Sequence, residues 1–120
     1  MKDTATILNH YLACALWASN DDQGEPLDSL YGVGDIDLAS VTAAIAEIEA
    51  FLFKCAFLGL DLDALDEEQI GHDLWLTRNH HGAGFWDRGL GDLGDKLTEI
   101  AHSLGGCDAY VGDDGKVYLS

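Results

Sequence analysis

The hydrophobic pattern of the first half of the chain predicts two helices. Residues 4–19 place apolar side chains at three- and four-residue steps, which is the spacing of one helix face. The positions are Ala5, Leu8, Leu12, Ala15 and Leu16. Residues 37–58 repeat this spacing over a longer stretch, at Leu38, Val41, Ile45, Ile48, Leu52 and Cys55. Asp3 or Thr4 and Asp37 are suited to cap the two helices.

The second half of the longer helix is apolar nearly all round. This results from Phe51, Phe53, Phe57 and Leu58. We therefore expect this half to form the buried centre of the domain. The same spacing permits a coiled coil, but the helix is short and lacks charged flanking positions, so core packing is the favoured interpretation.

Two segments combine acidic residues with residues that break regular structure. Residues 20–36 contain Asp21, Asp22 and Glu25 among glycines and a proline, and a loop of about seventeen residues is typical of a functional or mobile segment. Residues 60–69 hold five acids, namely Asp61, Asp63, Asp66, Glu67 and Glu68. They lack the glycine and ligand spacing of an EF-hand, so we expect an acidic loop or a short solvated helix.

Residues 70–89, IGHDLWLTRNHHGAGFWDRG, predict a β-hairpin. Residues 71–79 alternate around Leu74 and Trp75, and residues 83–88 form a second short run that contains Trp86. Between them, the Asn-His-His-Gly sequence of residues 79–82 has the composition of a turn. A third helix is expected over residues 92–104, and a second hairpin over residues 108–111 and 116–119.

The order helix, helix, hairpin, helix, hairpin predicts an α+β fold. We expect an antiparallel sheet of about four strands packed against three helices. The 120 residues suit a single domain, with a helical half at 1–59 and a hairpin–helix–hairpin half at 60–120.

The charge of the chain is strongly one-sided. Twenty-two acidic residues face six basic ones, which gives a formal net charge of −16. Such a field repels bare nucleic acid and favours partners with basic surfaces, including proteins whose normal ligand is DNA or RNA. An acidic protein without such a partner, from a salt-tolerant host, is the alternative. The three cysteines lack metal-ligand spacing and indicate free thiols in a reducing compartment. We expect neither a signal peptide nor a membrane span, and therefore a cytoplasmic protein.

Several residue types in the expected first hairpin have catalytic or metal-binding chemistry. His72, His80 and His81 with nearby aspartates suit a zinc or iron site, but their spacing favours a polar turn. A carboxylate on one strand and Arg78 or Arg88 on the other favour a cross-strand ion pair over catalysis. No cofactor or metal is predicted. Aromatic residues on the expected strands suit either a core or an interface to a basic partner, and they are Trp75, Trp86, Tyr110 and Tyr118.

The segment GHDLWLTRNHHGAGFWDRG, followed by GDLGDKLTEIAHSLG and AYVGDDGKVYLS, resembles a family of small acidic proteins of bacteriophages and prophages, mostly uncharacterised. The resemblance covers residues 71–119. It implies a phage origin and, by analogy of size, charge and source, an anti-CRISPR protein that mimics the charge of DNA. The chain departs from the family pattern at His80, where that pattern has glycine, which puts the geometry of a tight turn in question.

These observations favour a non-enzymatic phage protein that inhibits a host nucleic-acid-handling complex, most specifically CRISPR–Cas. The expected partner is a basic nucleic-acid-binding protein surface, without direct contact to nucleic acid or membrane. The expected contact residues are Asp21, Asp22, Glu25, Asp61, Asp63, Asp66, Glu67, Glu68, Trp75, Trp86 and Arg88. Two alternatives remain: a small hydrolase or metal-binding protein with its site at the His-rich hairpin, and a structural or homodimeric module.

Overall fold

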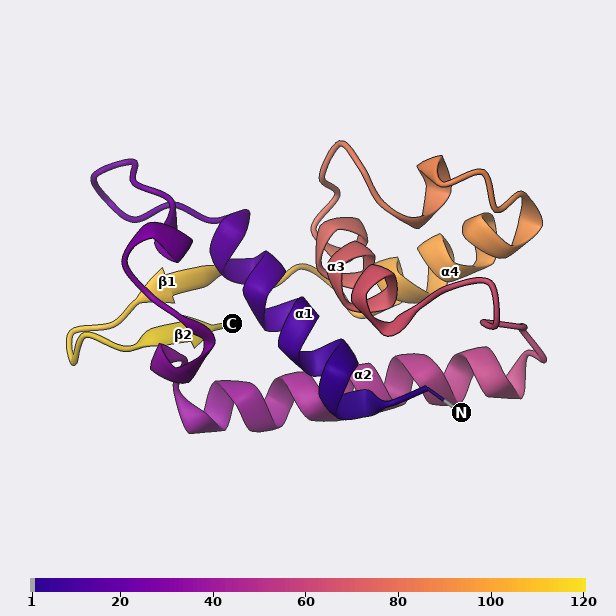
Figure 1. Cartoon of the computed structure of the whole chain (residues 1–120), viewed down its shortest axis with the longest axis horizontal. Helices are drawn as coiled ribbons and strands as arrows, with labels where there is room; N and C mark the ends of the chain where they lie inside the picture. The colour runs from indigo at the N-terminus through magenta and orange to yellow at the C-terminus, as the bar shows by residue number, and fades with distance from the viewer. Residues whose placement is uncertain (1) are drawn as a thin grey trace.

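The computed structural model describes residues 2–120 and has a mixed helical and strand architecture (Figure 1). In this part of the chain, four α-helices are joined by loops with short 3-10 turns, and one β-hairpin ends the chain. The elements are α1 (Thr4–Trp17), η1 (Leu27–Ser29), η2 (Val33–Asp35), α2 (Leu38–Phe57), α3 (Glu67–Arg78), η3 (Phe85–Asp87), α4 (Asp92–Ser103), β1 (Ala109–Val111) and β2 (Val117–Leu119).

The first two expected helices, the helix after residue 91 and the final hairpin are confirmed. Asp3 accepts a hydrogen bond from the amide of Ala5, and Asp37 accepts one from Ser40, so each caps its helix. The expected sheet of about four strands is wrong, because β1 and β2 form a two-stranded antiparallel sheet with Tyr110 opposite Tyr118. This hairpin is attached to the start of α2, where the amide of Asp37 donates to the Val117 carbonyl at 2.8 Å.

The expected first hairpin is also wrong, because residues 67–78 form α3. Asp66 caps this helix by accepting from the amide of Gln69 at 2.8 Å, and Glu67 and Glu68 face the positive end of the helix dipole. Residues 73–78 are all buried, so the second half of the helix has no exposed polar face to produce a 3.6-residue period. Without that period, the alternation of side chains around Leu74 and Trp75 resembles the pattern of a strand.

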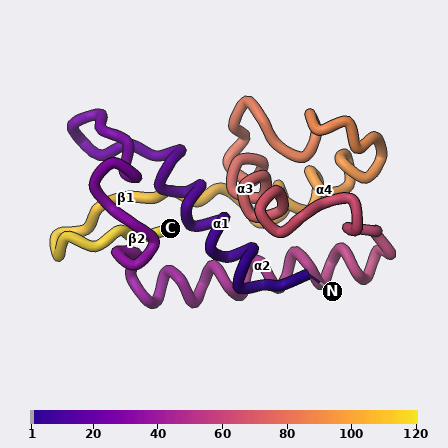
Figure 2. The backbone as a smooth tube through the Cα atoms, viewed as in Figure 1, coloured from indigo at the N-terminus to yellow at the C-terminus, as the bar shows by residue number. Residues whose placement is uncertain are grey.

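The path of the tube in Figure 2 shows α1 crossing close to α3, although the two helices lie far apart in the sequence. Gly71 makes this crossing possible, because a Cβ atom there would lie 2.8 Å from the Tyr11 amide nitrogen. The ring of Tyr11 packs edge-on against Trp75 with a centroid distance of 5.4 Å. The buried cluster is continuous and includes residues from both halves of the chain.

Arg78, at the end of α3, is an arginine with only 2% of its surface exposed. Its guanidinium donates to the Tyr11 hydroxyl at 2.9 Å, to the Gly105 carbonyl at 2.9 Å and to the Leu104 carbonyl at 3.1 Å. Glu47 of α2 completes the site with an ion pair of 2.9 Å. Burial opposes the charge, but the bonds to Glu47 and Tyr11 outweigh it and raise the pKa of Arg78 above its usual range.

The helix α2 lies along one side of the molecule in Figure 1 and buries only one of its faces. Ile48, Phe51 and Cys55 point into the core, where Phe51 stacks on Phe85 at 5.7 Å. The expectation that the whole second half is buried is wrong, because Phe53 is 70% and Phe57 is 79% exposed. None of the helices in residues 2–120 combines the length and apolar composition that a membrane span needs.

The end of α3 has the backbone geometry of a Schellman cap. The amide of His80 donates to the Thr77 carbonyl at 3.1 Å, and the amide of His81 donates to the Leu76 carbonyl at 3.0 Å. His80 takes the left-handed position with φ of 56°, the only positive value at a non-glycine residue in the described chain. The tight turn therefore forms with histidine, and the ring of His80 stacks on His102 at 4.1 Å.

We predict that His80→Gly is more stable than His80→Ala by about 1 kcal/mol. Both variants remove the stacked ring, so their difference reports the cost of a Cβ atom in the left-handed conformation. Urea unfolding of the two purified variants measures it. Equal midpoints, or a more stable alanine variant, would contradict the left-handed cap.

Candidate functional site

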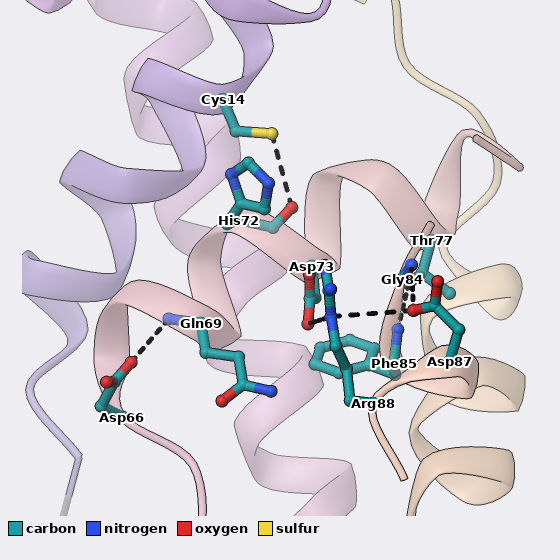
Figure 3. Close-up of polar contacts among 10 residues, drawn as sticks. All are labelled: Cys14, Asp66, Gln69, His72, Asp73, Thr77, Gly84, Phe85, Asp87 and Arg88. Carbon is teal, nitrogen blue, oxygen red and sulfur yellow. Dashed lines mark hydrogen bonds and ion pairs between the residues drawn. The ribbon is translucent and has the colours of Figure 1, made fainter. Parts of the chain in front are cut away.

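Polar contacts join the second half of α3 to the loop after it, as Figure 3 shows around Asp73, Arg88 and Asp87. Asp73 is 1% exposed and accepts two hydrogen bonds from Arg88, at 2.8 and 3.0 Å. The hydrogen bonding to Asp73 raises the pKa of Arg88, whereas burial lowers it. The hydrogen bonding has the larger effect, so the pKa of Arg88 lies above its usual range. Asp73 and Arg88 thus form an ion pair as expected, but the expected cross-strand geometry is wrong, because the pair joins α3 to the loop after it.

Two further contacts fix the loop, one to α3 and one within the loop itself. The Thr77 hydroxyl accepts a hydrogen bond from the Phe85 amide at 3.1 Å, and Asp87 accepts one from Gly84 at 3.2 Å. A Cβ atom at residue 84 would collide with the Thr77 hydroxyl, which explains the glycine. These bonds place Phe85 against α2 and leave Trp86 at the surface.

The histidines proposed for a metal or hydrolytic site have different neighbours. His72 lies beside Trp17 with a centroid distance of 5.6 Å, whereas His80 stacks on His102. Within residues 2–120, the structure contains no group of three or more histidine, cysteine, aspartate or glutamate side chains arranged to hold a metal ion. A hollow of about 480 Å³ opens between His72 and the ion pair, but both carboxylate oxygens of Asp73 already bind Arg88.

The acidic residues of segment 61–68 have mixed roles. Asp66 caps α3, and Glu67 accepts a hydrogen bond from the Asp3 amide at 3.0 Å, which lowers the pKa of Glu67. Asp61, Asp63 and Glu68 are exposed and take part in no ion pair within the described chain. Three of the five expected contact acids in this segment are therefore free to face a partner.

The acidic residues of loop 20–26 lie far from this segment, on the opposite side of the molecule in Figure 1. Asp21 accepts hydrogen bonds from the amides of Gln23 and Glu25, at 2.8 and 2.9 Å, and so shapes the loop. Asp22 and Glu25 are exposed. The structure thus places the expected contact acids in two separate patches.

The aromatic and basic residues among the expected contacts differ in their exposure and in their contacts within the chain. Trp75 is 2% exposed and lies on a helix, so the expectation that it contacts a partner is wrong. Trp86 is 50% exposed and remains available. Arg88 is partly exposed, but its guanidinium binds Asp73. Tyr110 and Tyr118 stack on each other at 5.8 Å on the final hairpin, with Tyr110 47% exposed.

A groove of about 600 Å³ runs between α2 and segment 60–63, and its residues were not among the expected contacts, apart from three acids of segment 61–68. Its apolar lining comes mainly from Leu52, Phe53, Leu60 and Leu62. Its polar lining consists of Lys2, Thr4, Glu49, Asp61, Asp63 and Glu67. The sequence predicts the exposed phenylalanines of α2 to lie in the core, because hydrophobicity alone does not distinguish a core face from an interface face.

The ratio of acidic to basic side chains outside ion pairs exceeds the ratio in the whole sequence. Among the described residues, the ion pairs involve three acids, Glu47, Asp73 and Asp87, and both arginines. Subtracting these three from 22 leaves 19 carboxylates outside any ion pair. The remaining bases are four lysines, namely Lys2, Lys54, Lys96 and Lys116.

Comparisons of the chain with protein-family models, curated proteins and solved structures find no match.

We predict that Arg88→Ala lowers the free energy of unfolding by about 3 kcal/mol, because it leaves the buried carboxylate of Asp73 without a partner. Asp87→Asn, which neutralises a neighbouring carboxylate but keeps its oxygen acceptor, should lower it by less than about 1 kcal/mol. Replacing the pair together, as Asp73→Leu with Arg88→Met, should recover most of the loss. Denaturant unfolding checks all three, and an Arg88→Ala effect no larger than that of Asp87→Asn contradicts the assignment.

We predict that the native protein reacts with iodoacetamide at Cys107 before Cys14 or Cys55. Burial raises the pKa of Cys14 to about 12 and of Cys55 to about 11, so both are protonated and shielded at mildly alkaline pH. Cys107 has a raised pKa as well, because it is half buried, but the nearby Arg78 opposes the shift. Peptide mass spectrometry measures the order, and the denatured protein, in which all three thiols should react alike, is the control.

Proposed function

We propose that this protein is an acidic inhibitor that binds the basic, nucleic-acid-binding surface of a host protein complex. One observation supports the proposal above the others: 19 carboxylates lie outside the ion pairs found within residues 2–120, while both arginines are engaged with carboxylates of the same chain. A surface with this imbalance attracts lysine- and arginine-rich surfaces and accelerates their association. It repels the phosphates of DNA and RNA.

The motif of α3 and its loop supports a binding role over a catalytic one. Its charged and hydroxyl side chains are used within the fold: Asp73 with Arg88, Thr77 with Phe85, and Arg78 with Tyr11. A catalytic acid or base requires a free carboxylate or imidazole within reach of a second group. The hydrolase and metal-binding alternatives receive no such support from the contacts of His72, His80 and His81.

Charge mimicry of DNA is the proposed mechanism. The exposed acids Asp61, Asp63 and Glu68 form one candidate contact patch, and Asp22 and Glu25 form the other. Either patch would occupy lysines and arginines that otherwise bind phosphates. The specific partner that we propose is a CRISPR–Cas surveillance complex in the cytoplasm of a phage-infected cell, which rests on the resemblance of residues 71–119 to small acidic phage proteins.

The proposal predicts salt-dependent binding to a Cas surveillance complex and competition with target DNA. One variant replaces Asp61, Asp63 and Glu68 by their amides, and a second replaces Asp22 and Glu25 by theirs. The variant that alters the contacting patch should weaken binding about tenfold. The amides keep the shape and hydrogen-bond acceptors, so each variant serves as the matched control for the other. Biosensor binding over a range of salt concentrations measures the effect. Absence of binding at low salt, or two fully active variants, would contradict the proposal.

A further inference from the structure

The outward face of α2 is an apolar stripe without a partner. Its members recur at four- and three-residue steps and are Ala39, Ala43, Ala46, Ala50, Phe53 and Phe57. All six are exposed, whereas Ala44, Ile48 and Phe51 on the opposite side are buried. A surface helix normally presents polar residues on this side. The stripe has the spacing by which one helix packs along another.

The apolar surface is continuous around the last two turns of α2. Phe53 lines the groove of about 600 Å³, and its ring stacks on Phe57 with a centroid distance of 6.5 Å. Phe57 in turn lines a hollow of about 340 Å³ between α2 and α4, together with Leu58 and Ile100. Phe53 is 70%, Phe57 79% and Leu58 56% exposed. Clustered exposed aromatics of this kind mark sites of protein association.

Acidic residues border this apolar surface. Glu49, Asp61, Asp63 and Glu67 line the groove, and Glu99 borders the hollow beside Phe57. The bases at the same sites are Lys2 and Lys54, and the amino group of Lys2 donates to the Leu65 carbonyl. A partner must therefore offer apolar side chains at its centre and positive charge at its edges.

We propose that this surface binds an amphipathic helix with an apolar face and basic flanks, supplied by a protein partner. The inference rests on the proposed function, because that function supplies the expectation of a basic partner. The inference adds that the partner contacts the outward face of α2. Apolar side chains of the incoming helix enter the groove beside Phe53 and pack along the alanines of α2. Its lysines and arginines face Glu49, Asp61 and Asp63.

Charge decides against a second copy of this chain as the occupant. Two copies would bring together chains with a formal charge of −16 each, and a paired α2 would place Glu49 of both copies near one seam. Like charges at such positions oppose pairing. A basic helix meets the same groove with opposite charge.

The test uses the full chain and a fluorescein-labelled leucine–lysine peptide of about 18 residues, which forms five helical turns with leucines on one face. A scrambled peptide of identical composition, without an apolar face, controls for nonspecific attraction between opposite charges. Anisotropy at about 0.15 M salt measures affinity. We expect the amphipathic peptide to bind at least about tenfold more tightly than the scrambled one.

Two pairs of variants locate the contact. Phe53→Ala with Phe57→Ala should weaken binding of the amphipathic peptide about tenfold, whereas Leu38→Ala should not. Leu38 is a matched control because it is 77% exposed on the same helix and lies outside the groove. Asp61→Asn with Asp63→Asn should weaken binding, and Asp108→Asn with Asp113→Asn, at exposed residues outside the groove, should leave it unchanged. Far-UV circular dichroism verifies that each variant remains folded.

Three results would overturn the inference. They are equal affinity for the two peptides, binding that is unaffected by the phenylalanine substitutions, and a dimer in light scattering that these substitutions dissociate. The peptide assay contains no nucleic-acid-binding complex. A protein that binds the amphipathic peptide at α2 but no Cas complex would therefore refute the proposed function alone. A protein that binds a Cas complex only through Asp22 and Glu25 would refute the inference alone.

Discussion

The fold depends on the burial of one guanidinium group. An arginine in a protein interior destabilises the fold by several kcal/mol unless its charge and its donors are satisfied. The groups that satisfy Arg78 belong to three other parts of the chain: Tyr11 of α1, Glu47 of α2 and the carbonyls of Leu104 and Gly105 at the end of α4. Satisfying one side chain therefore positions the other helices around α3, and a misplaced helix would leave a buried donor without an acceptor.

The remaining polar residues of the motif extend this arrangement to the loop. Asp73 requires Arg88, and Thr77 requires the Phe85 amide, so residues 84–88 fold back onto α3. Residues whose chemistry suggests an active site are thereby used in the architecture. The groups that remain available to a partner at the surface are the exposed carboxylates and the outward face of α2, where apolar and acidic residues lie side by side. This division is the basis on which we propose a binding function over a catalytic one.

The sequence predicts the elements with local signals and misplaces those decided by tertiary contacts. The spacing of apolar residues and the aspartate caps are sufficient to predict α1 and α2. The alternation of residues around a glycine-rich turn is sufficient to predict the final hairpin. Segment 67–78 was misassigned because its second half is buried all round, although an aspartate cap followed by Glu67 and Glu68 was a usable helix signal. The exposure of Phe53 and Phe57 could not be predicted, since it depends on which side of α2 the other helices occupy. Of the expected contact residues, the acids keep their place at the surface and Trp75 does not.

Amide hydrogen exchange, measured residue by residue in the native protein, tests the central claim most directly. If Arg78 and the Asp73–Arg88 pair join α1, α3 and the end of α4 into one cooperative unit, their slowest amides should exchange with the free energy of global unfolding. The amides of Phe85 and Gly84, which donate to α3 and to Asp87, should be protected as well. Exchange of α3 and residues 84–88 through a separate local opening, far below the global free energy, would contradict the account.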